Sequence, residues 1–440
     1  MDFNMGHPSS RSQVQLQRTG DLIAKCYLVV DLPGIANIGT GAADASSVDA
    51  TANEDASTTV TREAVEEAQA DAYVAAGGSC FVEDGAHANI VPYWCHAVGY
   101  RLIKEAELQI GNQTIDRLYC DFMYAYQELS QTPQKGVHEM VFDYASTADQ
   151  KKHSKFFRRL HVPLPFFMDA ANNLPIVSLQ FHNVNINIDW NSLDDCIVNR
   201  NASYGSTALK TVVRPGQTNV DAATSLTTFK AQDVSSTPAI SASDIVCRME
   251  GHYIFLDTAE RNKFASASYE MLITESSLNQ VTMPQTSTPE VSLDFNHAVQ
   301  EIIVVVRRGA NSDAKNWFNY GGVQDPITGI THDAVRKLEL TLNNNQRFDP
   351  QSGQYFRTVQ PFQHHRNIPA AHVYCYSFAL DADGKDPTGS ANHSRIDTKR
   401  LKLTLDPSIV TSSERPDIMV FARAWNILRV TKGLAGKVFS

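Results

Sequence analysis

Two segments in the first half of this chain have counterparts in the second half, and the counterparts come in the same order. AELQIGNQTID at 106–116 matches LELTLNNNQRFD at 338–349, with one extra residue before the final Asp, and DIVCRMEGHYIF at 244–255 matches DIMVFARAWNIL at 417–428. Because both pairs keep their order, we interpret them as the trace of a tandem duplication of one domain. The second half is therefore expected to repeat the fold of the first.

The residues in and around these segments alternate between two unlike faces with a period of two, which is the pattern of pleated strands. The alternation is plain at 373–378 and at 401–405. Its phase places Leu340 and Leu403 on buried faces, whereas Glu339 points outward. Short strands separated by long polar loops favour antiparallel β-sandwiches, and an eight-stranded jelly roll fits best.

The length of 440 residues exceeds what one hydrophobic core usually supports, so two domains are expected. We predict an all-β protein made of two tandem eight-stranded antiparallel jelly rolls, a double jelly roll, with a few short helices. The first jelly roll covers 1–257 and carries an insertion at 34–88. A linker helix at 258–274 precedes the second jelly roll at 275–440.

Local patterns predict three further features. The linker helix begins with a capping box, in which Asp257 is the N-cap and Glu260 its partner. Apolar residues recur with helical spacing over 118–129, and Asp116 is the expected cap of that helix. The strand pattern from Val177 to Trp190 changes parity, which predicts a bulge or short turn at 182–183.

Two stretches contain too few apolar residues to build a core. The insertion at 34–88 is rich in Ala, Gly, Ser, Thr and Asp, with one plausible helix at 61–76, and 199–243 is a second polar loop. We expect the insertion to be exposed and dispensable for folding. Residues 1–12 are polar and expected to be frayed.

The composition excludes several classes of protein. A formal net charge of −10 argues against a nucleic-acid binder, because such proteins neutralise phosphates with Lys and Arg. Seven scattered cysteines without a C-x-x-C pair indicate buried free thiols in a reducing compartment. The N-terminus has no apolar signal segment, and no apolar run reaches the ~20 residues that a membrane helix needs.

One cluster of histidines is found at His364 and His365, with His372 and His393 nearby. A metal ion would need three or four converging ligands, and adjacent residues of a strand point to opposite faces. We interpret the cluster as a polar loop and predict no metal site.

The segment 151–161 is a basic patch with interleaved aromatic residues, a composition used to bind single strands or acidic surfaces. Its members are Lys151, Lys152, Lys155, Arg158 and Arg159, with His153, Phe156, Phe157 and His161. A solvated connecting loop is the favoured interpretation, and contact with an acidic neighbour is the alternative.

Motifs that carry chemistry are missing. The sequence has no G-x-S-x-G elbow, no phosphate-binding P-loop and no H-E-x-x-H. We therefore predict a protein that is not an enzyme and has no catalytic residues, no cofactor and no metal.

Several ordered blocks resemble the major capsid proteins of nucleocytoplasmic large DNA viruses, the phycodnavirus, iridovirus and mimivirus-like family. The resemblance is spread through both halves of the chain. Its blocks include VPLPFF at 162–167, LPIVSLQFHNV at 174–184, LDFNHAVQEIIVVV at 293–306, QPFQ at 360–363, YSFAL at 376–380, PTG at 387–389 and NHSRID at 392–397.

This resemblance implies a structural subunit with two tandem jelly rolls that forms homotrimers of pseudo-hexameric outline in an icosahedral shell. The implied partners are other copies of the chain, neighbouring capsomers and minor capsid proteins, with the inner viral membrane as a further candidate and no specific nucleic acid. The implied location is the virion, after assembly in the host cytoplasm. The alternative is a carbohydrate-binding or cupin-like β-sandwich, since jelly rolls also host these functions.

The chain departs from the family pattern at its start. Only nineteen residues precede Gly20, and none of them matches the aromatic and arginine-rich segment found there in the family. We therefore expect an incomplete first strand and an uncovered sheet edge in the first jelly roll.

Overall fold

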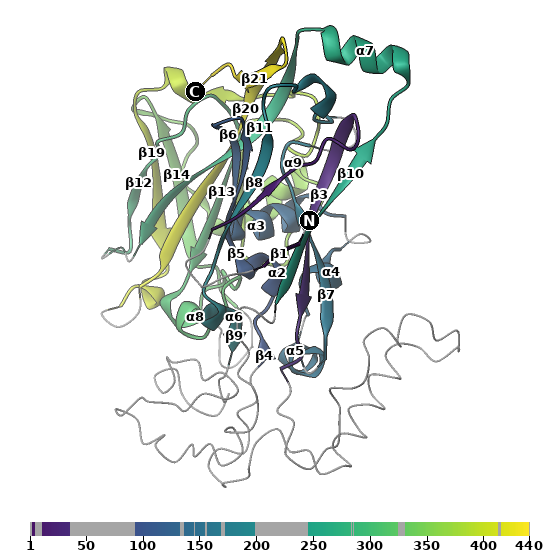
Figure 1. The fold of residues 1–440 in the computed structure, drawn as a ribbon. Helices are drawn as coiled ribbons and strands as arrows, with labels where there is room; N and C mark the ends of the chain where they lie inside the picture. The colour runs from purple at the N-terminus through teal and green to yellow at the C-terminus, as the bar shows by residue number, and fades with distance from the viewer. Residues whose placement is uncertain are drawn as a thin grey trace, which may run out of the picture.

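The computed structural model describes residues 2–4, 11–35, 93–132, 136–144, 146–154, 156–168, 172–198, 245–282, 284, 286–323, 331–411 and 415–439. The described strands form two β-sandwiches that lie side by side (Figure 1). The predicted helix at 61–76, the polar loop at 199–243 and nearly all of the insertion at 34–88 lie outside the described residues.

The first sandwich consists of two four-stranded antiparallel sheets, ordered β1-β10-β3-β7 and β2-β8-β5-β6. A short bridge, β4 (Tyr93–Trp94) to β9 (Ile197–Val198), lies beside them. The main strands are β1 (Asp2–Asn4), β2 (Arg11–Gln15), β3 (Leu22–Leu32), β5 (Ile103–Ile110), β6 (Gln113–Tyr119), β7 (Arg158–Leu164), β8 (Val184–Trp190) and β10 (Val246–Ile254).

The second sandwich repeats this arrangement with sheets ordered β11-β20-β13-β17 and β12-β19-β14-β15. Three short strands, β16 (Gln351–Ser352), β18 (Ala391–Asn392) and β21 (Leu434–Lys437), extend these sheets. The main strands are β11 (Tyr269–Thr282), β12 (Glu290–Ser292), β13 (Ala298–Arg307), β14 (Val335–Leu342), β15 (Asn345–Gln346), β17 (Tyr374–Ser377), β19 (Lys399–Leu405) and β20 (Asp417–Thr431).

The repeated sequence segments occupy equivalent places in the two sandwiches. The first pair forms the hairpins β5–β6 and β14–β15, whose turns need positive φ, 62° at Gly111 and 61° at Asn344. The second pair forms β10 and β20, each the second strand of its sheet. The predicted double jelly roll is therefore confirmed, and the duplication predicted from the sequence corresponds to a structural repeat.

Two central strands of one sheet in the second jelly roll, β13 and β20, are buried on both faces. Consecutive residues of β13 belong to different cores: Ile302 and Val304 pack in the core of the second jelly roll, whereas Ile303 and Val305 pack against the first. On β20, Phe421 likewise faces the first jelly roll. The sheet β11-β20-β13-β17 is thus a wall between two hydrophobic cores.

The helices are short and lie mainly in the connections. They are α2 (Val98–Leu102), α3 (Cys120–Ser130), α4 (His138–Val141), α5 (Thr147–His153), α6 (Leu193–Cys196), α7 (Thr258–Ser266), α8 (Gly309–Asp313) and α9 (Gln360–His364), with a π-helical turn η7 (Tyr355–Val359) and the 3₁₀ turns η4 (Ile176–Ser178), η8 (His393–Arg395) and η9 (Pro407–Ile409). None of the described helices has the length and apolarity needed to cross a membrane.

Two helix predictions require correction. Asp257 does cap α7 by accepting a hydrogen bond from Glu260 N, but the helix ends at Ser266 and residues 269–274 begin strand β11. Helix α3 (Cys120–Ser130) overlaps the predicted range 118–129, but Asp116 does not cap it, because β6 continues to Tyr119. The Asp116 carboxylate accepts from Ser276 N in the second jelly roll instead.

Three further predictions differ from the structure. Residues 176–178 form a 3₁₀ turn and the strand begins only at Val184, so 182–183 lie in an irregular connection before the strand and the change of parity does not come from a bulge within one strand. Residues 2–4 and 11–15 are not frayed: they form the edge strands β1 and β2, which pair with β10 and β8 and cover the edges that we expected to be open. Ile35, assigned to the insertion, is buried in the core.

The predictions for individual buried residues agree with the structure. Leu340 and Leu403 are buried, and Glu339 is partly exposed beside Lys402. The six cysteines of the described part are free and buried, as predicted.

Candidate functional site

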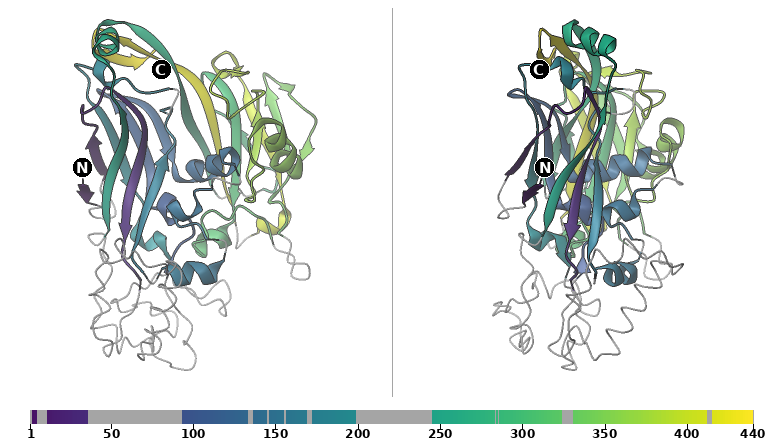
Figure 2. Two further views of the ribbon diagram at one scale, coloured as in Figure 1. Left: turned by 90° about the vertical axis from the view of Figure 1, so that its right-hand side faces the viewer. Right: turned by 45° about the vertical axis from the view of Figure 1, so that its right-hand side comes forward.

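Helix α3 is one of the elements that join the two jelly rolls. It follows β6 directly and packs on the face of β13 and β20 that points toward the first jelly roll (Figure 2). Its Phe122 ring lies 5.6 Å from the ring of Phe421, and the Arg423 guanidinium lies 4.8 Å from the centre of the Tyr126 ring. Aromatic and cation–π contacts of this kind fix the two domains in one relative position.

A buried ion pair anchors the N-terminal end of α3. Asp121 Oδ1 accepts hydrogen bonds from Arg307 Nη1 at 3.0 Å and from the Tyr320 hydroxyl at 2.9 Å. Burial alone would lower the pKa of Arg307, but the Asp121 carboxylate raises it, so the guanidinium stays charged. The pair joins the first jelly roll to the end of β13, and each of its side chains is only 9% exposed.

A second buried network lies on the same face of β13 and β20. Glu301 lies 3.1 Å from Arg423 Nη1 and 2.9 Å from His365 Nε2, and His365 Nδ1 lies 3.3 Å from Asp383. Burial would raise the pKa of Glu301, but His365 and Arg423 lower it. Burial would lower the pKa of His365, but the Glu301 carboxylate and the hydrogen bonds to Asp383 and Cys375 together raise it. Two cations thus compensate two carboxylates.

The structure does not bring the predicted histidine cluster together as a metal site. His365 belongs to the buried ionic network, and His364 Nδ1 lies 3.1 Å from Leu380 O. His393 is buried beside the Phe378 ring, and burial lowers its pKa to about 4. Within the described residues, none of the four histidines belongs to a group of three possible metal ligands.

Two arginines of the predicted basic patch have partners within the chain. Arg159 Nε donates to Asp31 Oδ1 at 2.7 Å, and Arg158 Nη2 lies 2.6 Å from His153 Nδ1. Lys155 lies outside the described residues. The Asp31 carboxylate offsets the positive charge of Arg159.

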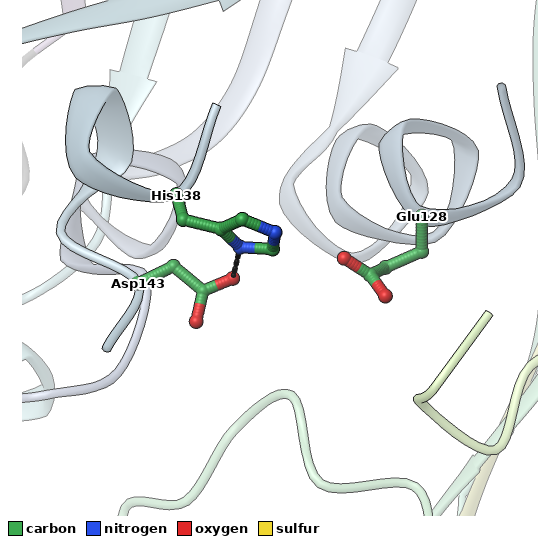
Figure 3. Close-up of side chains that lie close together, drawn as sticks. All are labelled: Glu128, His138 and Asp143. Atoms are coloured by element: carbon green, nitrogen blue, oxygen red, sulfur yellow. Dashed lines mark hydrogen bonds and ion pairs between the residues drawn. The ribbon is translucent and has the colours of Figure 1, made fainter. Parts of the chain in front are cut away.

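Sequence reasoning missed one compact group of possible ligands, formed by Glu128, His138 and Asp143 (Figure 3). His138 Nδ1 lies 2.9 Å from Asp143 Oδ2, Asp143 Oδ1 lies 3.1 Å from His96 Nε2, and Glu128 accepts from the Gln131 amide. Burial, with the nearby Asp143, raises the pKa of Glu128. Each of the three side chains therefore already has a partner within the protein.

The two most exposed large apolar side chains of the described residues lie on the second jelly roll, at α9 and on the loop bonded to it. Phe362 and Leu380 are 75% and 76% exposed, more than any other large apolar side chain in the described part of the chain. Ile368 and Val359 are also partly exposed, at 45% and 37%. Exposed apolar groups gathered in this way mark interaction surfaces.

Family models match both halves of the chain. The model described as "Major capsid protein N-terminus" matches residues 3–257, and the model described as "Large eukaryotic DNA virus major capsid protein" matches residues 260–436.

Individual relatives agree with these matches. The chain is 30% identical to the major capsid protein of Pyramimonas orientalis virus, over 78% of this chain and 77% of the relative, and 26% identical to that of Paramecium bursaria Chlorella virus 1, over 77% and 79%. Among solved structures, the PBCV-1 virus capsid model has a TM-score of 0.66 at 19% identity, covering 100% of this chain and 95% of that one. The Faustovirus major capsid protein has a TM-score of 0.65 at 12% identity, with 97% and 89% covered.

Proposed function

Since the chain belongs to the family of major capsid proteins of large eukaryotic DNA viruses, we propose that three copies of it assemble into one capsomer of pseudo-hexameric outline. The observation that carries this proposal is the structural repeat. Two jelly rolls of the same topology lie side by side in each subunit, so three subunits would present six similar sectors around a threefold axis.

The domain division that we propose follows the same repeat. The first jelly roll ends at 257, and the second begins after the helix α7 that connects β10 to β11. The two family models meet in the same region, which supports this division.

Family membership implies a place in the capsid of the virion. We extend this to contacts with neighbouring capsomers, with minor capsid proteins and with the inner viral membrane, and to assembly in the host cytoplasm. The protein is proposed to act by burying complementary surfaces, without a catalytic site, cofactor, metal or specific nucleic acid.

Light scattering coupled to size-exclusion chromatography tests the assembly. At micromolar concentration, the expected mass is three times 48.6 kDa, about 146 kDa. A mass that stays at one subunit across this range would contradict the proposal. The cupin-like or carbohydrate-binding alternative predicts instead a bound metal or a hit on a glycan array.

A further inference from the structure

The two elements that meet between the jelly rolls each have a counterpart in the other jelly roll. In the first jelly roll, α3 follows the hairpin β5–β6 and packs on the outward face of β20 and β13. In the second, the helical segment 355–364 follows the equivalent hairpin and strand β16. In the left view of Figure 2, blue α3 lies between the jelly rolls, whereas the yellow-green segment 355–364 lies on the side of the second jelly roll that faces away from the first.

Segment 355–364 carries apolar side chains on its surface, as α3 does. Phe362 and Val359 project from the segment, and Leu380 lies on the adjoining loop, which is held to α9 by the hydrogen bond from Ala382 N to His364 O at 2.9 Å. The corresponding surface of α3 buries Phe122 against Phe421. Each jelly roll therefore carries an aromatic side chain on this helical segment. Phe122 is buried against the second jelly roll, whereas Phe362 is exposed.

The matching uncovered face is the outward side of the sheet β1-β10-β3-β7. The alignment of β10 with β20 pairs Val246 with Met419 and Arg248 with Phe421. Met419 and Phe421 are buried against the first jelly roll, whereas Val246 is 44% exposed and Glu250 and His252 are exposed as well. Within the described part of the chain, the first jelly roll thus leaves exposed at Val246, Glu250 and His252 the face that its copy uses for the contact within the chain, and Arg248 on this face pairs with Asp31.

We propose that segment 355–364 and Leu380 of one subunit pack on the outward face of β10 and β3 of the next subunit. This inference rests on the proposed trimer and names its interface. Six similar domains around one axis have six neighbouring contacts, of which three lie within subunits and three between them. If the six domains are arranged in equivalent ways, each contact between subunits repeats the contact that α3 makes within a subunit.

The side chains named have the properties of interface anchors. A few buried aromatic and aliphatic groups at the centre of an interface usually carry most of the binding energy. Phe362 and Leu380 are largely exposed in the subunit, so a charge placed on them should leave the folded subunit intact. Buried in an interface, the same unpaired charges would be costly.

The first test introduces charges on each face separately. Phe362→Asp/Leu380→Asp alters the α9 surface, and Val246→Asp/His252→Asp alters the sheet face. At concentrations where the wild-type protein is trimeric, each double variant should be monomeric in light scattering. Its melting temperature should equal that of the wild-type protein diluted until it is monomeric. Phe181→Asp is the matched control, because Phe181 is 73% exposed but lies outside both faces, and this variant should remain trimeric.

The second test mixes the two variants. The α9 variant keeps an intact sheet face, and the sheet variant keeps an intact α9 surface, so one intact contact can form between them. The expected product is a one-to-one dimer, which neither variant forms alone and which cannot grow into a closed ring. An interface that joins two identical faces would give no such complementation.

The outcomes separate this inference from the proposed function. A wild-type protein that is always monomeric would overturn the trimer and the interface together. A trimeric wild type whose α9 variant is folded and still trimeric would overturn only the interface. Should the α9 variant fail to fold, the sheet-face variant decides alone: a folded monomer supports the assignment, and a trimer refutes it.

Discussion

At the scale of single residues, Asp116 shows how the position of a side chain in the assembled fold determines its chemistry. Its carboxyl group is buried where the two jelly rolls meet, and it accepts hydrogen bonds from Ser276 N and Arg117 N. Burial raises the pKa of Asp116 from 3.8 to about 7, and these hydrogen bonds oppose the shift only in part. The folded protein therefore holds a proton that the unfolded chain has lost between these two pH values.

This difference predicts a loss of stability as the pH rises. Because the folded pKa is raised, the stabilisation is complete below pH 3.8 and is lost as the pH rises to about 7, at up to about 1.4 kcal/mol per pH unit. Asp116→Asn keeps an acceptor oxygen and cannot ionise. Urea unfolding at pH 5 and pH 8 should show a fall in the free energy of unfolding that is smaller in the variant, by about 2 kcal/mol. Equal falls in both proteins would contradict the assignment.

At the scale of elements, the connection between α3 and β13 rests on the buried pair of Asp121 and Arg307. Removing one partner leaves a charge buried without compensation, so Asp121→Asn or Arg307→Met alone should lower the free energy of unfolding by about 3–5 kcal/mol. The double variant should lose less than the sum of the two, because neither charge remains. Denaturant unfolding of the three variants measures this coupling.

The matched control is an exposed pair. Arg336 donates to Asp406 at 3.0 Å, but its side chain is 58% exposed, so Arg336→Met should change stability by less than about 1 kcal/mol. Strictly additive effects of Asp121→Asn and Arg307→Met would show that the buried pair does not join the two elements.

How far the sequence predicts these elements depends on whether the signal is local. The alternation with a period of two predicted the strands and the burial of Leu340 and Leu403 correctly, because alternation is a property of neighbouring residues. The helical spacing that included Leu118 led to the wrong cap for α3, since one residue of a strand can continue a helical pattern by chance. The capping of α7 by Asp257 is local and was found correctly.

The buried networks could not be predicted in this way, because their members come together only through the topology. Glu301 stands within an apolar run, which signals a buried charge, but nothing near it in the sequence points to Arg423. One long-range signal was available. The duplicated strand carries Arg248 in its first copy and Phe421 in its second, a change from polar to aromatic that indicates which copy is covered within the subunit.

At the scale of the whole molecule, we expect both jelly rolls to unfold together. The face of β13 and β20 toward the first jelly roll carries Ile303, Val305 and Phe421, which would all be exposed if the second jelly roll stood alone. Calorimetry of the full chain should show one transition. A fragment covering 267–440 should aggregate or bind a hydrophobic dye, and a soluble fragment with native circular dichroism would contradict this expectation.

The strands β13 and β20, which lie between the two cores, also limit how such a chain can evolve. In a freshly duplicated pair of sandwiches, either copy could be lost and the other would survive. Once the outer face of β13 and β20 had become apolar, the second copy without the first would expose that face to water. The duplication thereby becomes difficult to reverse. Mutations that deepen the contact remove the option of separating the halves, so that they are inherited as a single unit.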